Sequence, residues 1–348
     1  MQITTVGLDL AKNLFQVHAV DERGKTVLRK SLRRAQVLEF FTQLGACLIG
    51  MEACGSAHHW ARQLSRLGHT VKLMAPQFVK AYVKTNKNDA RDAEAICEAV
   101  SRPSMRFVPV KTVEQQQLLA LHRARQGFVR ARTAQANQIR GLLSELGLVI
   151  PQGLASLQRQ LPGLLADPST ALSPLSRELF SRLCAHLREL DRQVKELAQQ
   201  IERWHRDSPE SQRLEKIPGI GPLTASALVG SLADASSFHS GRQLAAWLGL
   251  VPRQSSSGGK ERLLGISKRG DTYLRTLLIH GARAVLLSRA RRGRAEEGWL
   301  GRLAQRGHPN IAAVGLANKN ARIVWALLRH QRHYQADYRS SPRPAVCA

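Results

Sequence analysis

The fold of the N-terminal part of the chain is set by residues 3–31, ITTVGLDLAKNLFQVHAVDERGKTVLRKS. Two runs in it, Ile3–Leu10 and Leu14–Val20, are predicted to be strands because they are apolar and rich in β-branched residues. Asp21–Gly24 has the composition of a turn, and Lys25–Ser31 is expected to be a third strand. The stretch therefore predicts a meander of strands.

Beyond this meander, helical and strand patterns alternate along the chain. Helices are expected over Ala35–Leu44 and His58–Leu67, and short strands over Ala46–Met51 and His69–Met74. Alternation of this kind is typical of a sheet with helices packed on it. We expect an α/β domain built on a mixed sheet.

From about Val113 the pattern becomes helical. Gln115–Leu146 is predicted to be one long helix, and Pro151–Pro174 a loop-rich break. The next helix carries a narrow apolar stripe with alternating spacings of three and four: Leu179, Leu183, Leu187, Leu190, Val194, Leu197, Ile201 and Trp204. This spacing favours a coiled-coil seam over a helix packed on its own domain. We expect the seam to drive assembly.

The rest of the chain is expected to be helical with glycine-rich interruptions, over Leu214–Leu232, Gly241–Gly249, Lys268–Ser288 and Ile311–Gln331. The fold class is therefore α/β plus all-α. We divide the chain into an α/β domain (1–112), long helices with a coiled coil (113–207), a helical C-terminal domain (208–331) and a basic tail (332–348).

The charge of the chain points to a polyanionic partner. Lys and Arg number 52 against 26 Asp and Glu, which gives a formal net charge of +26. Such an excess is self-repulsive unless a polyanion neutralises it, and nucleic acid is the usual one. Ribosomal-type or chromatin-type packing is the alternative, whereas a membrane surface is disfavoured because no segment joins a basic face to an exposed aromatic one.

The cysteines and apolar runs indicate a cytoplasmic protein. None of the five cysteines forms a Cys-x-x-Cys pair or has histidines at zinc-finger spacing: Cys47, Cys54, Cys97, Cys184 and Cys347. Reduced thiols are the simplest interpretation. No signal pattern and no apolar run long enough for a bilayer is present in the sequence, so no membrane association is expected.

Four acidic residues stand out in this basic chain. Asp9 lies inside the first strand, and Glu52 follows the apolar strand Ala46–Met51. A carboxylate within a strand is costly to bury unless it is paired or bound to a metal. Asp89 and Asp92 are three residues apart, which places them on one face of a helix. If the two strands are neighbours, the carboxylates of Asp9 and Glu52 can point to one sheet face. Four carboxylates from two strands and a helix suit a hard divalent cation such as Mg²⁺ (or Mn²⁺), which would bind the oxygens of a phosphodiester.

Each acid also has a purely structural interpretation. Asp9 suits an ion pair with Lys12, Glu52 the cap of a following helix, Asp89 the favourable end of a helix dipole, and Asp92 an ion pair with Arg91. Singly, these interpretations are as good as the catalytic one; jointly, they explain the pattern less well.

Two glycine-rich motifs follow. Ile217–Gly221 has the composition of a helix-hairpin-helix turn, in which Gly219 and Gly221 let backbone N–H groups approach a phosphate; a tight interhelical turn is the alternative. Downstream, Ser255–Gly259 has the composition of a flexible linker, and composition alone favours that interpretation. A serine there would instead be a nucleophile for a phosphodiester, because cations that stabilise phosphorane charge surround it: Arg253, Lys260, Arg262, Lys268 and Arg269.

Together these motifs resemble a known family. The stretches Gly7–Lys12, Met51–Ala53, Asn88–Ala93, Ile217–Gly221 and Ser256–Gly259, in this order, resemble the insertion-sequence one-hundred-and-ten family of DEDD transposases, in its eleven-eleven-type branch. The resemblance extends over nearly the whole chain, from Gln2 to about Gln331.

The resemblance implies both a fold and a set of partners. It implies a RuvC-like (RNase H-like) N-terminal domain, a coiled-coil insertion, a C-terminal transposase domain, and guidance by a non-coding bridge RNA that pairs with donor and target DNA. The four catalytic, metal-binding acids become Asp9, Glu52, Asp89 and Asp92. The nucleophilic serine maps to Ser257, directly before Gly258, with Ser256 as the alternative.

Our hypothesis is therefore a transposase that cuts and rejoins DNA through a covalent phosphoserine, acting as a homodimer or homotetramer. The RNA is expected to lie along the long helix, whose arginines are Arg123, Arg125, Arg130, Arg132 and Arg140. The rival hypotheses are a metal-dependent junction-resolving nuclease, in which water attacks, and a non-catalytic nucleic-acid-binding scaffold.

Overall fold

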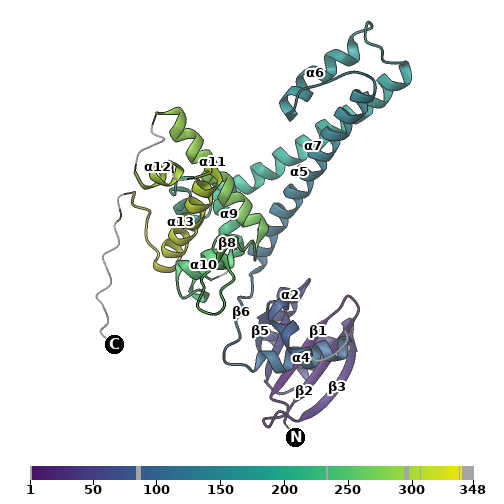
Figure 1. The fold of residues 1–348 in the computed structure, drawn as a ribbon. Helices are drawn as coiled ribbons and strands as arrows, with labels where there is room; N and C mark the ends of the chain where they lie inside the picture. Colours follow the sequence, from purple (N-terminus) through teal and green to yellow (C-terminus); the bar gives the residue numbers. More distant parts are fainter. Residues whose placement is uncertain are drawn as a thin grey trace. The chain divides into compact units, whose positions relative to one another are not determined.

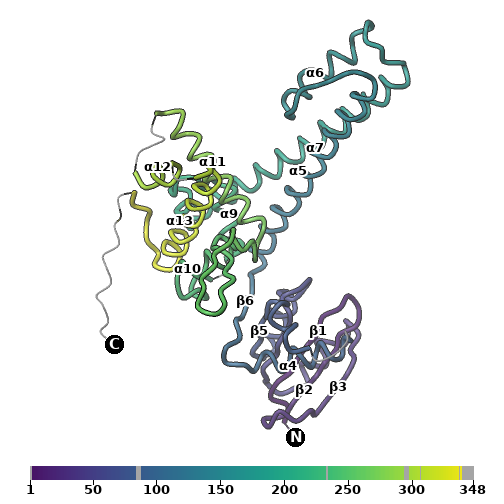
Figure 2. The backbone as a smooth tube through the Cα atoms, viewed as in Figure 1, coloured from purple at the N-terminus to yellow at the C-terminus, as the bar shows by residue number. Residues whose placement is uncertain are grey.

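The computed structural model describes residues 2–83, 88–232, 234–293, 298–305, 307–336 and 338, so most of the tail expected over 332–348 lies outside the described residues. The chain divides into two compact units, residues 1–113 and 114–348. The first is a sheet with helices packed on it, and the second is helical (Figure 1, Figure 2). No helix within the described ranges is long and apolar enough to cross a membrane.

The N-terminal unit is built on a six-stranded mixed sheet of order β3-β2-β1-β4-β5-β6. Its strands are β1 (Thr5–Leu10), β2 (Leu14–Val20), β3 (Thr26–Arg33), β4 (Leu48–Glu52), β5 (Thr70–Met74) and β6 (Phe107–Val108). The first three form the expected antiparallel meander, while β4 is parallel to both β1 and β5. The predicted α/β class with a mixed sheet is confirmed, and the sheet order is compatible with an RNase H-like domain.

Different helices cover the two faces of this sheet. One face carries the apolar residues Val6, Leu8, Phe15 and Val17 and packs against α1 (Val37–Thr42) and α2 (Ala57–Arg66). The other face is crossed by α4 (Asp89–Val100), which contacts β1, β2 and β4 (Figure 1). Between β5 and α4 lie α3 (Pro76–Val79) and a short 3-10 turn. The central strands β1 and β4 therefore alternate their side chains between two covered faces.

Two long helices dominate the first part of the second unit. α5 (Val113–Glu145) and α7 (Pro174–Arg206) lie side by side, and α6 (Leu154–Ala166) packs at the far end of this pair (Figure 2). The sequence predicted a loop-rich break over Pro151–Pro174, but α6 occupies the larger part of this stretch. Pro162 lies inside α6, and the frequent prolines of this stretch led to the prediction of a loop.

The leucine stripe on α7 is largely used within the chain. Leu187, Leu190, Val194 and Ile201 are buried, and His186 Nδ1 and the Gln135 side chain of α5 lie 2.7 Å apart in a hydrogen bond. Part of the stripe is covered within the same chain, since Leu187 packs in one apolar cluster with Ala136, Ile139 and Leu143 of α5, and a seam between subunits stays a prediction. A periodic apolar stripe shows that one face of a helix is covered, but it does not show whether the same chain or another chain covers it.

The rest of the second unit is a helical core. It contains α8 (Pro209–Glu215), α9 (Pro222–Ser231), α10 (Gly241–Trp247), α11 (Thr272–Arg291), α12 (Gly298–Gln305) and α13 (Pro309–His330). α13 packs against both α10 and α11 around one apolar cluster. Between α10 and α11 the chain forms a two-stranded hairpin of β7 (Pro252–Gln254) and β8 (Leu263–Ile266).

Candidate active site

Asp9 and Glu52 lie at the same end of two neighbouring parallel strands. β1 and β4 pair in register from Thr5 opposite Leu48 to Leu8 opposite Met51, so Asp9 and Glu52 are the next pair along. Because side chains alternate along a strand, Asp9 shares its sheet face with Gly7, and Glu52 shares its face with Gly50. Gly7 and Gly50 both contact α4, so the two carboxylates belong to the face that α4 covers.

Close contacts at these two glycines fix the position of α4. A Cβ atom at Gly7 would lie 2.1 Å from the Ala93 carbonyl oxygen, and one at Gly50 would lie 2.7 Å from Cβ of Val100. The thiol of Cys97 donates to the Thr5 carbonyl oxygen at 3.8 Å. α4 therefore runs antiparallel to β1, with its first turn toward the end of the strand where Asp9 lies.

The first turn of α4 carries the other two acids. The Asn88 side chain caps the helix by accepting from the Ala90 N–H at 3.0 Å. Asp89 lies one turn before Ala93, on the stripe that meets β1, and Asp92 is half-buried beside it. The structure thus places all four acids at one end of the α4 face, two on strands and two on the helix.

The electrostatics agree with the placement of the two strand acids, Asp9 and Glu52. The pKa of the Cys54 thiol is raised, first by partial burial of its sulfur and then by the negative charges of Glu52 and Asp9. Within the described ranges, however, no three His, Cys, Asp or Glu side chains stand close enough together to hold a metal ion. The donor set nonetheless fits a hard divalent cation chemically, since all four side chains are carboxylates, two from strand ends and two from the first turn of α4.

Gly7 and Gly50 position α4, a role that was not predicted from the sequence. Each lies two residues before a strand acid, in the patterns Gly7-Leu8-Asp9 and Gly50-Met51-Glu52. Two residues is the repeat of a strand, so the glycine and the acid share a face. The repeated pattern is the signal that would have revealed the helix contact.

The three serines lie at the exposed tip of the β7–β8 hairpin rather than in a linker. The Lys260 N–H donates to the Ser257 carbonyl at 3.1 Å, and between them Gly258 and Gly259 have φ of +57° and +77°. Two consecutive residues with positive φ form the type I′ turn that suits a tight hairpin, and glycine adopts this conformation at no steric cost. The linker expected from composition is therefore an ordered turn.

The hydroxyls of Ser256 and Ser257 differ in their bonding. Ser256 Oγ accepts from the Arg262 N–H at 3.3 Å and from Gln254 Nε2 at 3.0 Å, which ties it to the two strands of the hairpin. In the part of the chain that the structure describes, the side chain of Ser257 makes no hydrogen bond. Ser256 is thus bound into the hairpin, whereas Ser257 presents its hydroxyl to solvent.

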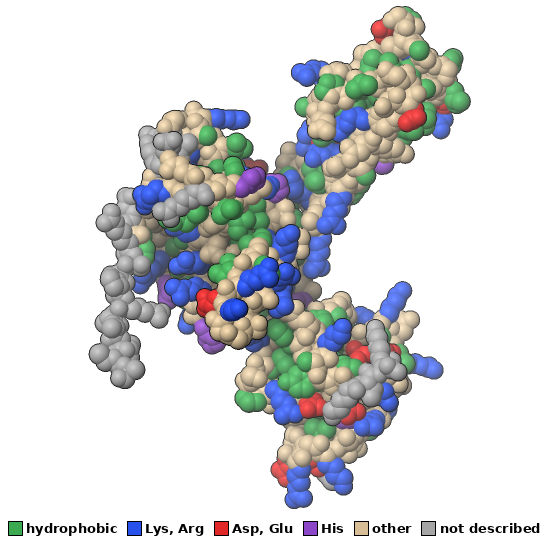
Figure 3. Space-filling model, in the orientation of Figure 1, with side chains coloured by type: hydrophobic (Ala, Val, Ile, Leu, Met, Phe, Trp, Pro, Cys, Tyr) green, Lys and Arg blue, Asp and Glu red, His purple; other side chains and the backbone are tan. Residues whose placement is uncertain are grey.

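A buried arginine anchors the base of the hairpin. Arg275, on α11, is 7% exposed, and its Nη1 donates at 3.0 Å to the carbonyls of both Leu248 and Arg269. These carbonyls lie just before and just after the hairpin. The five cations expected around the serines are all exposed: Arg253, Lys260, Arg262, Lys268 and Arg269. Figure 3 shows Lys and Arg side chains gathered on this side of the helical unit, with few acids among them.

Comparison with known proteins decides the family. Residues 6–147 match the DEDD transposase model of the IS110 type, and residues 211–297 match the model of the IS116/IS110/IS902 transposase family. The chain is 54% identical to a probable family 20 transposase of Pseudomonas aeruginosa over 96% of this chain and 99% of that protein. The chain belongs to the IS110 family of transposases.

Further relatives agree. The transposase of insertion sequence element IS1111A of Coxiella burnetii is 45% identical over 96% of this chain and 92% of that protein. The transposase of element IS1328 of Yersinia enterocolitica is 45% identical over 93% and 96%. This transposase is thus an enzyme of transposition, which cleaves and rejoins DNA, and its DEDD family implies a divalent metal ion.

The glycine-rich turn between α8 and α9 of the transposase has a packing role. A Cβ atom at Gly219 would lie 2.9 Å from the Gly281 carbonyl on α11, and one at Gly281 would lie 1.8 Å from the Gly219 carbonyl. The Pro218 carbonyl accepts from Asn320 Nδ2 at 2.9 Å. Gly221 is exposed at the start of α9 and has open space around it. Of the two predicted phosphate-binding glycines, Gly219 packs closely against the backbone of α11, and Gly221 is exposed to solvent.

The five arginines predicted along the long helix of this transposase do not form one free surface. Arg132 Nη1 donates at 2.5 Å to Asp191 of α7, where Lys195 also pairs at 2.9 Å. Arg125 and Arg140 are half-buried, whereas Arg123 and Arg130 are exposed. Arg132 is therefore a structural link between α5 and α7, and Arg123 and Arg130 are the residues best placed to meet nucleic acid.

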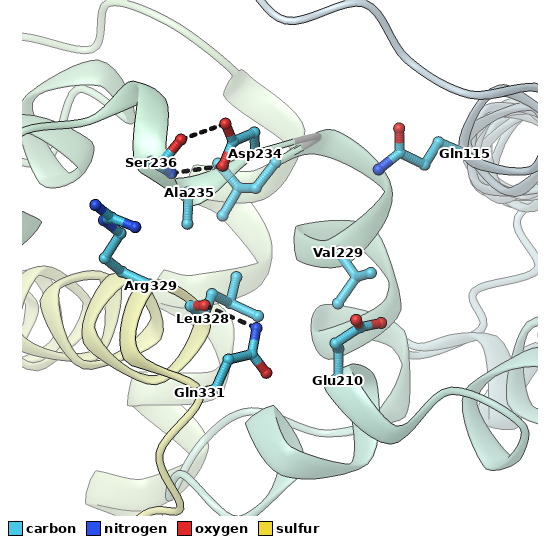
Figure 4. A pocket seen from close by; sticks show the side chains of 10 residues that line it. Gln115, Glu210, Val229, Asp234, Ala235, Ser236, Leu328, Arg329 and Gln331 are labelled. Carbon is cyan, nitrogen blue, oxygen red and sulfur yellow. Dashed lines mark hydrogen bonds between the residues drawn. The ribbon is translucent and has the colours of Figure 1, made fainter.

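The helical unit also contains a pocket of about 300 Å³, and none of the residues that line it belongs to the serine hairpin (Figure 4). Asp234 accepts from the Ser236 N–H at 2.7 Å and from the Ser236 hydroxyl, and Gln331 Nε2 donates to the Leu328 carbonyl at 3.2 Å. The carboxylate of Asp234 thus caps a helical turn. We assign the pocket no part in the chemistry.

Proposed function

We propose that this transposase joins DNA through a covalent bond to Ser257, with the scissile phosphate held at Asp9, Glu52, Asp89 and Asp92. The observation that carries the proposal is the contrast within the hairpin: Ser256 is bound by its strands, and Ser257 projects an exposed hydroxyl among cations. The four acids would hold Mg²⁺ or Mn²⁺, which when bound neutralises charge on the phosphate oxygens.

The reaction proceeds by two displacements at one phosphorus. Ser257 Oγ gives up its proton and bonds to phosphorus while the bond to a deoxyribose oxygen breaks, and that oxygen takes up a proton. A hydroxyl of a second DNA end then attacks the phosphorus and releases the serine. Arg253 and Lys260 stabilise the extra negative charge of each pentacoordinate state. No water is consumed, so the DNA is rejoined rather than hydrolysed.

The partners follow from the same proposal. A non-coding bridge RNA is held at Arg123 and Arg130 and pairs with donor and target DNA. Ser257 of one subunit serves the acids of another in a homodimer or homotetramer. The RNA that co-purifies with the full chain, once sequenced, tests the first statement. The mass of the DNA-bound complex tests the second.

The decisive test is a covalent adduct on a nicked DNA substrate carrying the end of the element. We expect the native chain and Ser256→Ala to form an adduct that survives denaturation, and Ser257→Ala to form none. Cleavage without adduct in Ser257→Ala would show that water attacks, as in a nuclease. An adduct lost only in Ser256→Ala would move the nucleophile by one residue.

The acids need their own control. Asp9→Asn is expected to abolish cleavage, because the substitution removes a charge that the metal ion requires. DNA binding should persist. Binding without cleavage by the native chain, at any divalent metal tested, would leave only a nucleic-acid-binding scaffold.

A further inference from the structure

A polar row extends from Asp9 across the sheet to its free edge. Asp9 is opposite Gln16 of β2, and Gln16 is opposite Ser31 of β3. Directly opposite residues share a face, so all three belong to the face that α4 covers. Arg29, opposite His18, and Arg33, opposite Leu14, lie on the same face of β3. We call Gln16, Arg29, Ser31 and Arg33 the β3 shelf.

The side chains of the β3 shelf are accessible and carry donors. Ser31, Arg29 and Arg33 are exposed, and β3 is the edge strand of the sheet. Ser31 Oγ donates at 2.7 Å to Gln16 Oε1, which leaves the Nε2–H groups of that amide as donors beside Asp9. Arg29 pairs with Glu94 at 3.4 Å, and both side chains are largely exposed, so the pair is weak and exchangeable.

The opposite side of the same strand has a different character. Lys30 points to the other face, where its Nζ lies 5.3 Å from the centre of the Phe40 ring. Arg34, just beyond the strand, lies over the rings of Trp60 and Phe15 at 5.2 and 6.0 Å. Those cations are engaged with aromatic rings, whereas the β3 shelf offers its charge to solvent.

We propose that the β3 shelf binds the backbone of the DNA strand that is cut, at the phosphates next to the one held by the acids. The inference rests on the proposed function of Asp9. Four carboxylates repel the phosphates of DNA. The cations and hydrogen-bond donors of the β3 shelf, on the same face, would attract those phosphates and so offset the repulsion. Strands are about 4.8 Å apart, so Ser31 lies about 10 Å from Asp9. With one phosphate per about 3.4 Å of axis in each strand, the shelf reaches phosphates within about three nucleotides of the cut.

Charge removal on the two faces of β3 tests the shelf. We expect Arg33→Gln to slow adduct formation about tenfold at subsaturating DNA and to lower the salt dependence of binding by about one phosphate contact. Lys30→Gln, the same change on the other face, should leave both near the native values. Uncharged methylphosphonates within three nucleotides of the cut should slow the native chain and have no further effect on Arg33→Gln.

A binding measurement separates this inference from the proposed chemistry. A photocrosslinking amino acid, p-benzoylphenylalanine, replaces Arg33 or Lys30 in the full chain, and crosslinks are mapped on labelled DNA. Crosslinks from position 33, and not 30, within three nucleotides of the cut support the shelf. Equal crosslinking from both positions, or crosslinks from 33 only to RNA, overturn it. If cleavage and adduct formation occur while these crosslinks are absent, the proposed role of the β3 shelf is wrong and the proposed function stands. If the native chain forms no adduct, the proposed function itself is wrong.

Discussion

Replacing Gly7 by alanine should displace the helix that carries half of the candidate site. The new Cβ would lie 2.1 Å from the Ala93 carbonyl oxygen and 2.5 Å from the Cys97 nitrogen, against an ordinary contact of at least 3.4 Å. These atoms are backbone, so no side chain can turn away, and α4 must retreat by more than an ångström. Overpacking of this kind costs about 1–3 kcal/mol, and we expect the upper end.

The functional cost should exceed the loss of stability. Asp89 and Asp92 move with α4 while Asp9 stays on β1, and a misplacement of about 1 Å lowers catalysis on the order of 100-fold. Hydrogen exchange of the amides in residues 5–10 and 89–100, together with adduct formation on the nicked substrate, measures both effects. Gly45→Ala is the matched control, since a Cβ atom there meets nothing within 4 Å. Native protection and native adduct yield in Gly7→Ala would refute the close contact between α4 and β1.

Two further predictions concern the helical unit. Burial, with a smaller contribution from the Arg125 charge, lowers the pKa of His122 to about 4, from about 6.5 when unfolded, so its stabilising contribution is complete above pH 6.5 and is lost as the pH falls toward 4. We expect up to about 3 kcal/mol of the unfolding free energy to be lost in that range, and urea unfolding of His122→Gln, which lacks the titration, should show a smaller decline. Arg275→Met should loosen the serine hairpin without unfolding the chain, because it removes hydrogen bonds to two main-chain carbonyls at the base. Proteolysis within residues 253–263 should rise and kcat for adduct formation fall, while DNA affinity stays near native; unchanged proteolysis would contradict the anchoring role.

The sequence predicted elements well where one periodicity dominated. β2 has the bounds that were predicted, Leu14–Val20, and α5 differs from its predicted range by two residues at the start and one at the end. Both segments follow one regular pattern over their whole length. The prediction failed where local composition and tertiary context disagree. The serine and glycine run resembled a linker, yet hydrogen bonds between its flanking strands make it a hairpin tip.

The candidate acids were found from their local surroundings, but their convergence could be predicted only on the condition that two strands are neighbours. A carboxylate between Leu8 and Leu10 is unusual whatever the fold, so Asp9 was visible in the sequence alone. That Glu52 comes next to it depends on β4 pairing in parallel with β1, a long-range register that no local pattern specifies. Arg132 shows the converse: the arginine-rich helix predicted contact with nucleic acid, but no local pattern indicated the ion pair that Arg132 forms with Asp191, 59 residues away.

The distribution of charge around the acids explains how a DNA-binding protein tolerates an acidic centre. Asp89 and Asp92 occupy the first turn of α4, where the helix dipole favours negative charge. Asp9 faces the amide of Gln16 across one strand spacing, and arginines stand two strands away on the same face. Repulsion among the four carboxylates is thus offset by groups on the sheet itself, over distances shorter than the screening length of about 8 Å in physiological salt or close to it. A net charge of +26 spread over the chain attracts DNA from afar, and the arginines on this face add positive charge close to the acids.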